Sequence, residues 1–262
     1  MANLSLFDLT GKHAVVVGGA GGIGQAIAEG LAEAGAQVMI ASRKEESLER
    51  AKKEILDKTG LVILSHACDA YNEDDVIGLL DYAVKTMGTV EILFNCQGFN
   101  KKFPGTETPK DVFEQMLNAN VTSLMLTCKH FGKYMKDNDI HGKIVNIGSV
   151  RGVRAVGNGG GGNVGYCTTK GAVEMLTKAF ATDLRPNIQV NLIGPTITYT
   201  PMMVGILPDD PAERAKFAAA LPAMRIGEVD DCKGTAIFLA SEASDFITGS
   251  SIYPDGGLTA IG

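Results

Sequence analysis

The chain has 262 residues, of which 45% are hydrophobic and 21% are charged, and its formal net charge is −6. It has no strongly basic segment, so we expect no nucleic-acid partner. No apolar run approaches the roughly 20 residues that a membrane span needs, so we expect no membrane partner either. The N-terminus lacks a basic region followed by an apolar one, so we expect no signal peptide and a cytoplasmic location.

The five cysteines are widely spaced and form no CxxC pair. This pattern argues against a disulfide framework and against a zinc site. The four histidines show no ligand spacing, so we expect no metal.

Strand and helix patterns alternate along the chain. The first strand is expected at Ala14–Val17, and Ile23–Ala34 follows with apolar residues at helical spacing. The later strands are expected at Gln37–Ala41, Val62–Ser65, Ile92–Asn95, Lys143–Ile147, Ile188–Ile193 and Ser251–Tyr253. The later helices are expected at Glu45–Leu56, Asn72–Met87, Asp111–Lys136, Gly165–Leu184 and Asp230–Ser241. The alternation predicts one α/β domain over residues 1–262, a Rossmann-type doubly wound parallel sheet with helices on both faces.

Two stretches interrupt the alternation. Val153–Asn163 is rich in glycine and is expected to be flexible. Residues 196–221 contain three prolines and one short helical stretch, and are too long for a plain connection. They follow a strand at the ligand edge of the sheet, so we expect a substrate lid. The alternative is a surface loop that does not contact the substrate.

A glycine-rich loop, VVVGGAGGIG, links the first strand to the first helix. Gly18 permits a tight turn, Gly22 lets the backbone approach a pyrophosphate, and Gly24 lets helix and strand pack closely. The helix N-terminus adds free N–H groups and a positive dipole end. The loop predicts a dinucleotide site.

The spacing GxxxGxG is followed by five further motifs in a fixed order. They are Asn95-Cys96-Gln97-Gly98 (similar to NNAG), IVNIGS ending at Ser149 (similar to IVNISS), Tyr166-x-x-x-Lys170 (YxxxK), VNLIG before Pro195, and Asp255-Gly256-Gly257 (DGG). Over nearly its whole length the chain resembles the short-chain dehydrogenase/reductase family. NIGS, IQVNLIGP and IYPDGG resemble its gluconate 5-dehydrogenase-like group.

The expected catalytic residues are Asn120, Ser149, Tyr166 and Lys170. A free Tyr has a pKa of about 10, and a nearby cation lowers it, so Lys170, one helical turn from Tyr166, is expected to do so. Ser149 ends a strand, where its hydroxyl can polarise a substrate oxygen. The resemblance implies that Asn120 holds a water that links Lys170 to solvent.

Ser42 and Arg43 end the second strand, where an NAD site would favour an acidic residue. Arg43 can face a 2′-phosphate, so we expect NADP(H), with NAD(H) as the alternative. One departure counts against NADP(H), because relatives often place a second basic residue where this chain has Gly21. The expected cofactor-binding residues are Gly18, Gly22, Ile23, Gly24, Ser42, Arg43, Asp69, Asn95, Gly98, Tyr166, Lys170, Pro195, Thr198 and Thr200.

The resemblance implies an oxidoreductase that interconverts a secondary alcohol and a ketone, on a sugar, polyol or sugar acid. A 3-oxoacyl thioester, steroid or small-ketone reductase is the alternative, and a cofactor-sensing regulatory protein is a distant one. Four basic residues in loops after the fourth and fifth strands could face an anionic substrate: Lys101, Lys102, Arg151 and Arg154. The resemblance also implies a homotetramer, and an apolar stripe on the helix that carries Lys170 agrees with it: Ala172, Val173, Leu176, Ala179 and Phe180.

Overall fold

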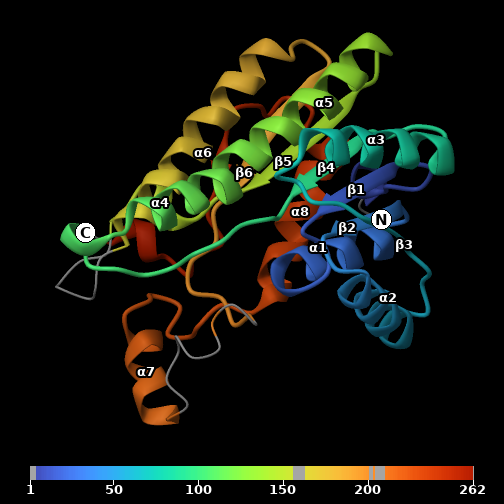
Figure 1. Ribbon diagram of the computed structural model, residues 1–262. Helices are drawn as coiled ribbons and strands as arrows, with labels where there is room; N and C mark the ends of the chain where they lie inside the picture. Colours follow the sequence, from blue (N-terminus) through green and yellow to red (C-terminus); the bar gives the residue numbers. More distant parts are fainter. Residues whose placement is uncertain (1–3, 156–162, 201–202, 204–209, 262) are drawn as a thin grey trace.

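The strands of the computed structural model join one parallel sheet in the order β3-β2-β1-β4-β5-β6-β7 (Figure 1). The structure describes residues 4–155, 163–200, 203 and 210–261. The strands are β1 His13–Val17, β2 Gln37–Ser42, β3 Leu64–Ala67, β4 Ile92–Asn95, β5 Gly142–Ile147, β6 Ile188–Ile193 and β7 Ser251–Ile252. The strand order reverses between β1 and β4, which places a ligand crevice at their carboxyl ends. The predicted doubly wound fold is confirmed.

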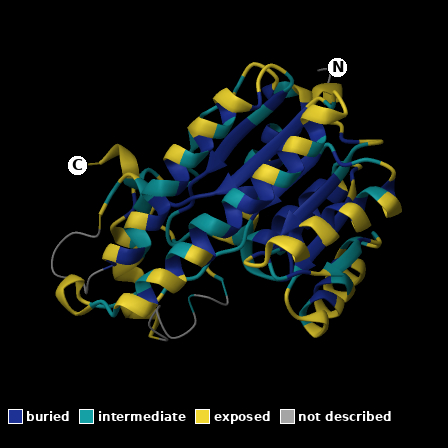
Figure 2. Cartoon of the chain, turned by 45° about the horizontal axis from the view of Figure 1, so that its top comes forward, coloured by how far each residue is buried: buried dark blue, intermediate teal, exposed yellow. Residues whose placement is uncertain are grey.

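Helices cover both faces of the sheet, and their exposed surfaces point outward (Figure 2). They are α1 Gly22–Glu33, α2 Glu45–Thr59, α3 Glu73–Met87, α4 Lys110–Leu117, α5 Ser123–Asp137, α6 Val164–Asp183, α7 Pro211–Ala219 and α8 Lys233–Ala240. Alternate residues of β1 belong to two cores. Ala14 and Val16 pack with α1, α2 and α8, whereas Val15 and Val17 pack with α3, α5 and α6. Burial on both faces explains why β1 is apolar from Ala14 to Val17.

Several predicted elements differ from the structure at their ends, and the helix expected at Asp230–Ser241 begins with a 3-10 turn, so that α8 starts at Lys233. The single helix expected at Asp111–Lys136 is divided into α4 and α5 by a π-helical turn at Asn118–Thr122. Such turns insert an extra residue into a helix and often mark functional sites. The third strand begins at Leu64 rather than Val62, because pairing with β2 starts at Met39 and Leu64.

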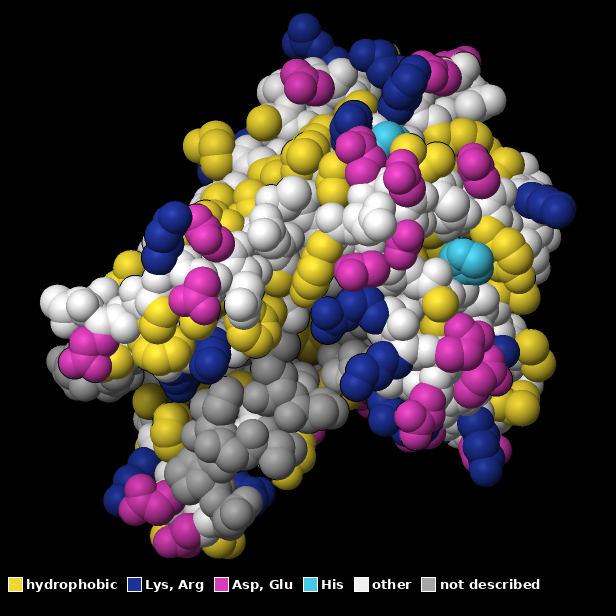
Figure 3. All heavy atoms as spheres, viewed as in Figure 1, with side chains coloured by type: hydrophobic (Ala, Val, Ile, Leu, Met, Phe, Trp, Pro, Cys, Tyr) yellow, Lys and Arg dark blue, Asp and Glu magenta, His cyan; other side chains and the backbone are white. Residues whose placement is uncertain are grey.

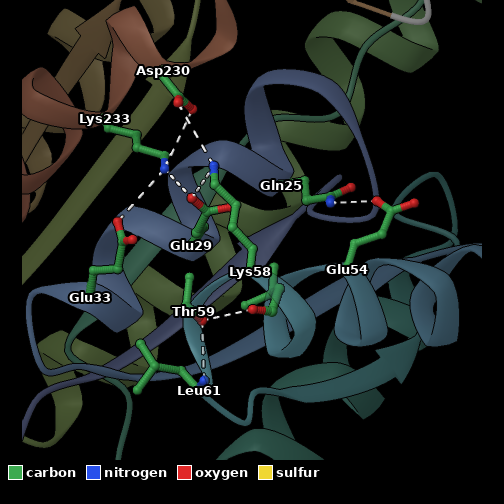
Figure 4. A network of polar contacts seen from close by, with 10 residues as sticks. Gln25, Glu29, Glu33, Glu54, Lys58, Thr59, Leu61, Asp230 and Lys233 are labelled. Carbon is green, nitrogen blue, oxygen red and sulfur yellow. Dashed lines mark hydrogen bonds and ion pairs between the residues drawn. The ribbon is translucent and has the colours of Figure 1, made fainter.

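A buried carboxylate ties α1 to α2 and α8 (Figure 4). Glu29 of α1 accepts a hydrogen bond from Lys233 of α8, and its Oε1 lies 2.6 Å from Lys58 Nζ of α2. Lys233 Nζ also lies 3.4 Å from an oxygen of Asp230 and 3.7 Å from one of Glu33. Only 6% of the Glu29 side chain is exposed, so its charge requires these cations. The network fixes the helix that begins at the glycine loop.

All five cysteines are free thiols. Among the described residues, no helix has the length and hydropathy needed to cross a membrane. The same residues contain no cluster of His, Cys, Asp or Glu side chains that could hold a metal ion.

Candidate active site

A cavity of about 440 Å³ opens at the carboxyl ends of the central strands. The loops after β1, β2, β3, β4, β5 and β6 line it together with α6. All of the predicted cofactor-binding residues except Asn95 line this cavity, and so does Ser149. Residues separated by more than 180 positions in the sequence therefore meet at one site, where a doubly wound sheet binds its ligands.

The glycine loop packs closely against the segment that follows β4. Gly18 has a φ of +79°, and a Cβ at this position would lie 2.6 Å from the backbone nitrogen of Gln97. A Cβ at Gly24 would overlap the carbonyl oxygen of Gly18. At Gly21, by contrast, a Cβ would meet nothing within 4 Å, so the loop is open on that side.

The loop and α1 form a cradle that fits a pyrophosphate. Gly21, the N-cap of α1, provides no side-chain hydrogen bond to the first turn of the helix. The first N–H groups of a helix have no partner within the helix, and the dipole there favours an anion. The observed backbone is thus suited to an anion, and pyrophosphate binding stays a prediction.

Tyr166, Lys170 and Ser149 lie together in the cavity wall. Lys170 is 3% exposed, its Nζ donates to the carbonyl oxygen of Ile147 at 2.7 Å, and it lies 5.6 Å from the centre of the Tyr166 ring. The Ser149 hydroxyl accepts a hydrogen bond from the Arg151 N–H at 3.2 Å. One face of α6 and the end of β5 thus bring the expected proton-transfer groups to one place.

The pKa values of the two groups on α6 move in opposite directions. Burial raises the pKa of the Tyr166 phenol to about 12, against a hydrogen bond from Ser149 and the charge of Arg151, which lower it. Burial also lowers the pKa of Lys170 to about 8. We expected the pKa of Tyr166 to be lowered, and this prediction is wrong, because burial outweighs the contributions that lower it. Tyr166 is therefore a neutral phenol that can donate a proton.

Asn120 lies on the π-helical turn, fully buried, next to the cavity wall. Its Oδ1 accepts from the Phe99 N–H at 2.6 Å, and its Nδ2 donates to Phe99 O at 2.8 Å and to Thr169 Oγ1 at 2.9 Å. A Cβ at Gly98 would lie 3.1 Å from Asn120 Oδ1 and 3.9 Å from Lys170 Nζ. Asn120 therefore fixes the loop after β4 beside Lys170, and its water-binding role stays a prediction.

Asn95 lies outside the cavity lining, although we expected it to bind the cofactor. It is fully buried, and its Nδ2 donates to Asn146 Oδ1 at 2.9 Å. Its Oδ1 accepts from the Thr127 hydroxyl at 2.7 Å. These bonds join β4, β5 and α5, so the described contacts of the Asn95 side chain are structural.

Two arginines are among the residues that line the cavity. Arg43 lies with its guanidinium carbon 5.3 Å from the centre of the Tyr71 ring. Arg50 of α2 lines the same cavity, and sequence reasoning missed it. Its only sequence signal is its position on a charged helix that follows the Ser42-Arg43 strand end. Asp69 also lies there and accepts from the Tyr71 N–H at 3.2 Å.

The four basic residues that could face an anionic substrate do not line the cavity. Lys101 lies over the Phe103 ring, and Lys102 is exposed. Arg151 donates to the carbonyl oxygen of Ala155 at 3.1 Å, and Arg154 donates to that of Ile261 at 2.6 Å. In the described structure, Arg151 therefore binds the backbone of its own loop, and Arg154 binds the backbone near the C-terminus.

Two predictions fall partly outside the described residues. Residues 156–162, which include the glycines expected to be flexible, are not described, and neither are residues 201–202 and 204–209 of the expected lid. Thr196, Thr198, Thr200 and Met203 line the cavity. The lid stays a prediction.

A family model described as enoyl-(acyl carrier protein) reductase matches residues 18–259. The chain belongs to the short-chain dehydrogenase/reductase family. This confirms the resemblance read from the motifs and, with it, the class of enzyme: an oxidoreductase that uses a nicotinamide cofactor.

Relatives in this family include enzymes for sugar acids and for steroids. The chain is 34% identical to gluconate 5-dehydrogenase of Gluconobacter oxydans, with 99% of each chain covered. It is 35% identical to 3beta-hydroxysteroid dehydrogenase 2 of Eggerthella lenta, with 96% of each covered. The crystal structure of a gluconate 5-dehydrogenase from Burkholderia cenocepacia, in complex with NADP and tartrate, superposes with a TM-score of 0.90 at 34% identity and 98% coverage of both chains.

Proposed function

We propose that this protein interconverts a secondary alcohol and a ketone on a sugar acid, with NADP(H) as its cofactor, in the cytoplasm. The observation that carries the proposal is the convergence of Ser149, Tyr166 and Lys170 on the cavity that the glycine loop borders. The named sugar-acid relatives support the substrate class. The five free thiols agree with a reducing compartment.

The described residues fit the cofactor. The glycine loop and the start of α1 would hold the pyrophosphate, Arg43 the 2′-phosphate, Asp69 the adenine, and Lys170 the nicotinamide ribose. Pro195, Thr198 and Thr200 would lie at the nicotinamide. When bound, the cofactor supplies or accepts the hydride.

The protein's own groups handle the proton. In ketone reduction, the neutral Tyr166 phenol gives its proton to the carbonyl oxygen, which Ser149 polarises through its hydroxyl. The charged Lys170 stabilises the tyrosinate that remains, and protonation from solvent restores the phenol. Alcohol oxidation uses the same groups in reverse and requires the tyrosinate, whose formation burial opposes.

The substrate class is tested by a panel that contains gluconate, 5-keto-gluconate, polyols, a 3-oxoacyl thioester and a 3-hydroxysteroid, each assayed with both cofactors by NAD(P)H absorbance. We expect the highest kcat/KM on a sugar acid. The steroid or thioester alternative, which the steroid relative favours, replaces this proposal if either of those compounds has the higher kcat/KM.

We also propose a homotetramer. On α6, Leu176 and Phe180 are only partly buried, Met175 is 64% exposed and Val164 is 52% exposed, so the helix keeps apolar surface beyond its core contacts. Phe246, near the last strand, is fully exposed. We expect sedimentation equilibrium at micromolar concentration to give four times the chain mass; a monomer under these conditions would contradict the assembly.

A further inference from the structure

A second arginine contacts the glycine loop. Arg50 is on the second turn of α2, and its Nη2 donates to the carbonyl oxygen of Ala20 at 3.2 Å. This bond brings a guanidinium from α2 to the loop residue next to Gly21. Since a Cβ at Gly21 would meet nothing within 4 Å, no described atom fills the space beside that loop position.

The charge of Arg50 is only weakly compensated. Its Nε lies 3.8 Å from Glu54 Oε1, and the two side chains are 59% and 53% exposed. Exposed ion pairs of this kind contribute little. The other oxygen of Glu54 accepts from Gln25 Nε2 at 2.7 Å, as Figure 4 shows. An arginine has five N–H donors, so these contacts leave donors of Arg50 available for a ligand.

Arg43 provides a second cation to the lining of the cavity. Arg43, Arg50, Ser42 and Gly21 all line it. Figure 3 shows Lys and Arg side chains interspersed with Asp and Glu side chains over the region that α1 and α2 occupy in Figure 1. Two guanidinium groups in the lining of one cavity are suited to a doubly charged phosphate monoester, which accepts several charge-assisted hydrogen bonds.

We propose that Arg50 is a specificity-determining residue that binds the 2′-phosphate of the cofactor together with Arg43. The inference rests on the proposed use of NADP(H). It also accounts for the missing basic residue in the glycine loop: the second cation comes from α2 across the loop rather than from position 21.

The competing explanation is that Arg50 only holds the loop through Ala20. A residue with that role would support NADPH and NADH equally, because both cofactors place a pyrophosphate on the loop. Comparing the two cofactors, which differ at the 2′ position, separates the two explanations.

The test measures dissociation constants of NADPH and NADH by titration calorimetry for the wild type, Arg50→Gln and Lys53→Gln. Lys53 is exposed on the same helix and does not line the cavity, so its substitution controls for the loss of one charge. We expect Arg50→Gln to weaken NADPH binding about tenfold and to leave NADH binding within about twofold, as the loss of a charged hydrogen bond predicts. Lys53→Gln should change neither constant beyond about twofold.

A second ligand pair makes the result independent of the nicotinamide half. Adenosine 2′-monophosphate should lose affinity for the Arg50→Gln variant, whereas adenosine 5′-monophosphate should not. Equal losses for both cofactors, or no loss for either, would overturn the assignment of Arg50 while NADP(H) use by the wild type stands. A wild type that binds NADH more tightly than NADPH would overturn the cofactor proposal itself.

Discussion

Replacement of Tyr166 by phenylalanine is expected to lower kcat by at least about a thousandfold, in the range that loss of a positioned general acid causes. The substitution removes only the hydroxyl that gives its proton to the substrate. The ring that lies 5.6 Å from Lys170 Nζ is kept, so the wall of the cavity should keep its shape. Dissociation constants of the cofactor should therefore stay within about twofold of the wild type, because the phenylalanine still packs at this position.

The measurement combines steady-state rates with cofactor titration. Tyr82→Phe is the matched control, because it makes the same chemical change on α3, where Tyr82 stacks on His66 and does not line the cavity. Its kcat should equal that of the wild type. Near-normal turnover by Tyr166→Phe would remove the phenol from the proton-transfer step.

The protonation states of Tyr166 and Lys170 should make the rate of the reaction depend on pH. Burial holds the pKa of Tyr166 near 12 and that of Lys170 near 8, so near neutral pH the phenol is neutral and the ammonium is charged. This protonation state suits ketone reduction. Since the charge of Lys170 is lost as the pH rises through about 8, its support for a tyrosinate is lost over the same range.

The strands and the layers could be predicted because each strand has its own local signal, whereas the order of the strands in the sheet comes from the structure. β1 and β4 contain apolar runs, and each is followed by a glycine-rich or polar loop and then by a helical pattern. The carboxyl ends of these strands must meet at one edge, so Gly18, Ser149 and Tyr166 could be placed together before any coordinates.

The missed features depend on contacts that no local pattern records. The π-helical turn at Asn118–Thr122 continues the helical spacing on both sides, so the periodicity reads as one helix. Arg50 is one of several charged residues on α2, and only the packing of this helix beside the glycine loop distinguishes it from Lys53. Asn95 matched a family motif, yet its side chain is held outside the cavity lining by hydrogen bonds with the buried side chains of Asn146 and Thr127.

Substitution of Arg43 by aspartate is expected to have the largest effect on cofactor choice. A carboxylate at the end of β2 would repel a 2′-phosphate and could accept a hydrogen bond from a 2′-hydroxyl. Arg43 lies over the Tyr71 ring and lines the cavity next to Ser42, so the new carboxylate would face the same ligand group. We expect NADPH to bind about a hundredfold more weakly, or about 2.7 kcal/mol, and NADH to bind at least as well as before.

Lys44→Asp is the matched control for this change of charge. Lys44 directly follows Arg43, is exposed and does not line the cavity, so the same two-unit change in net charge there acts only through solvent. Such an exposed charge is screened by salt, whereas a direct contact with the 2′-phosphate is screened much less. At 0.15 M salt, NADPH binding should therefore fall for Arg43→Asp and stay within about threefold for Lys44→Asp. Equal losses of NADPH affinity in the two variants would mean that Arg43 acts through the long-range electrostatic field and not by direct contact. A wild type that binds NADH tenfold more tightly than NADPH would show that Arg43 does not make the protein prefer NADP(H).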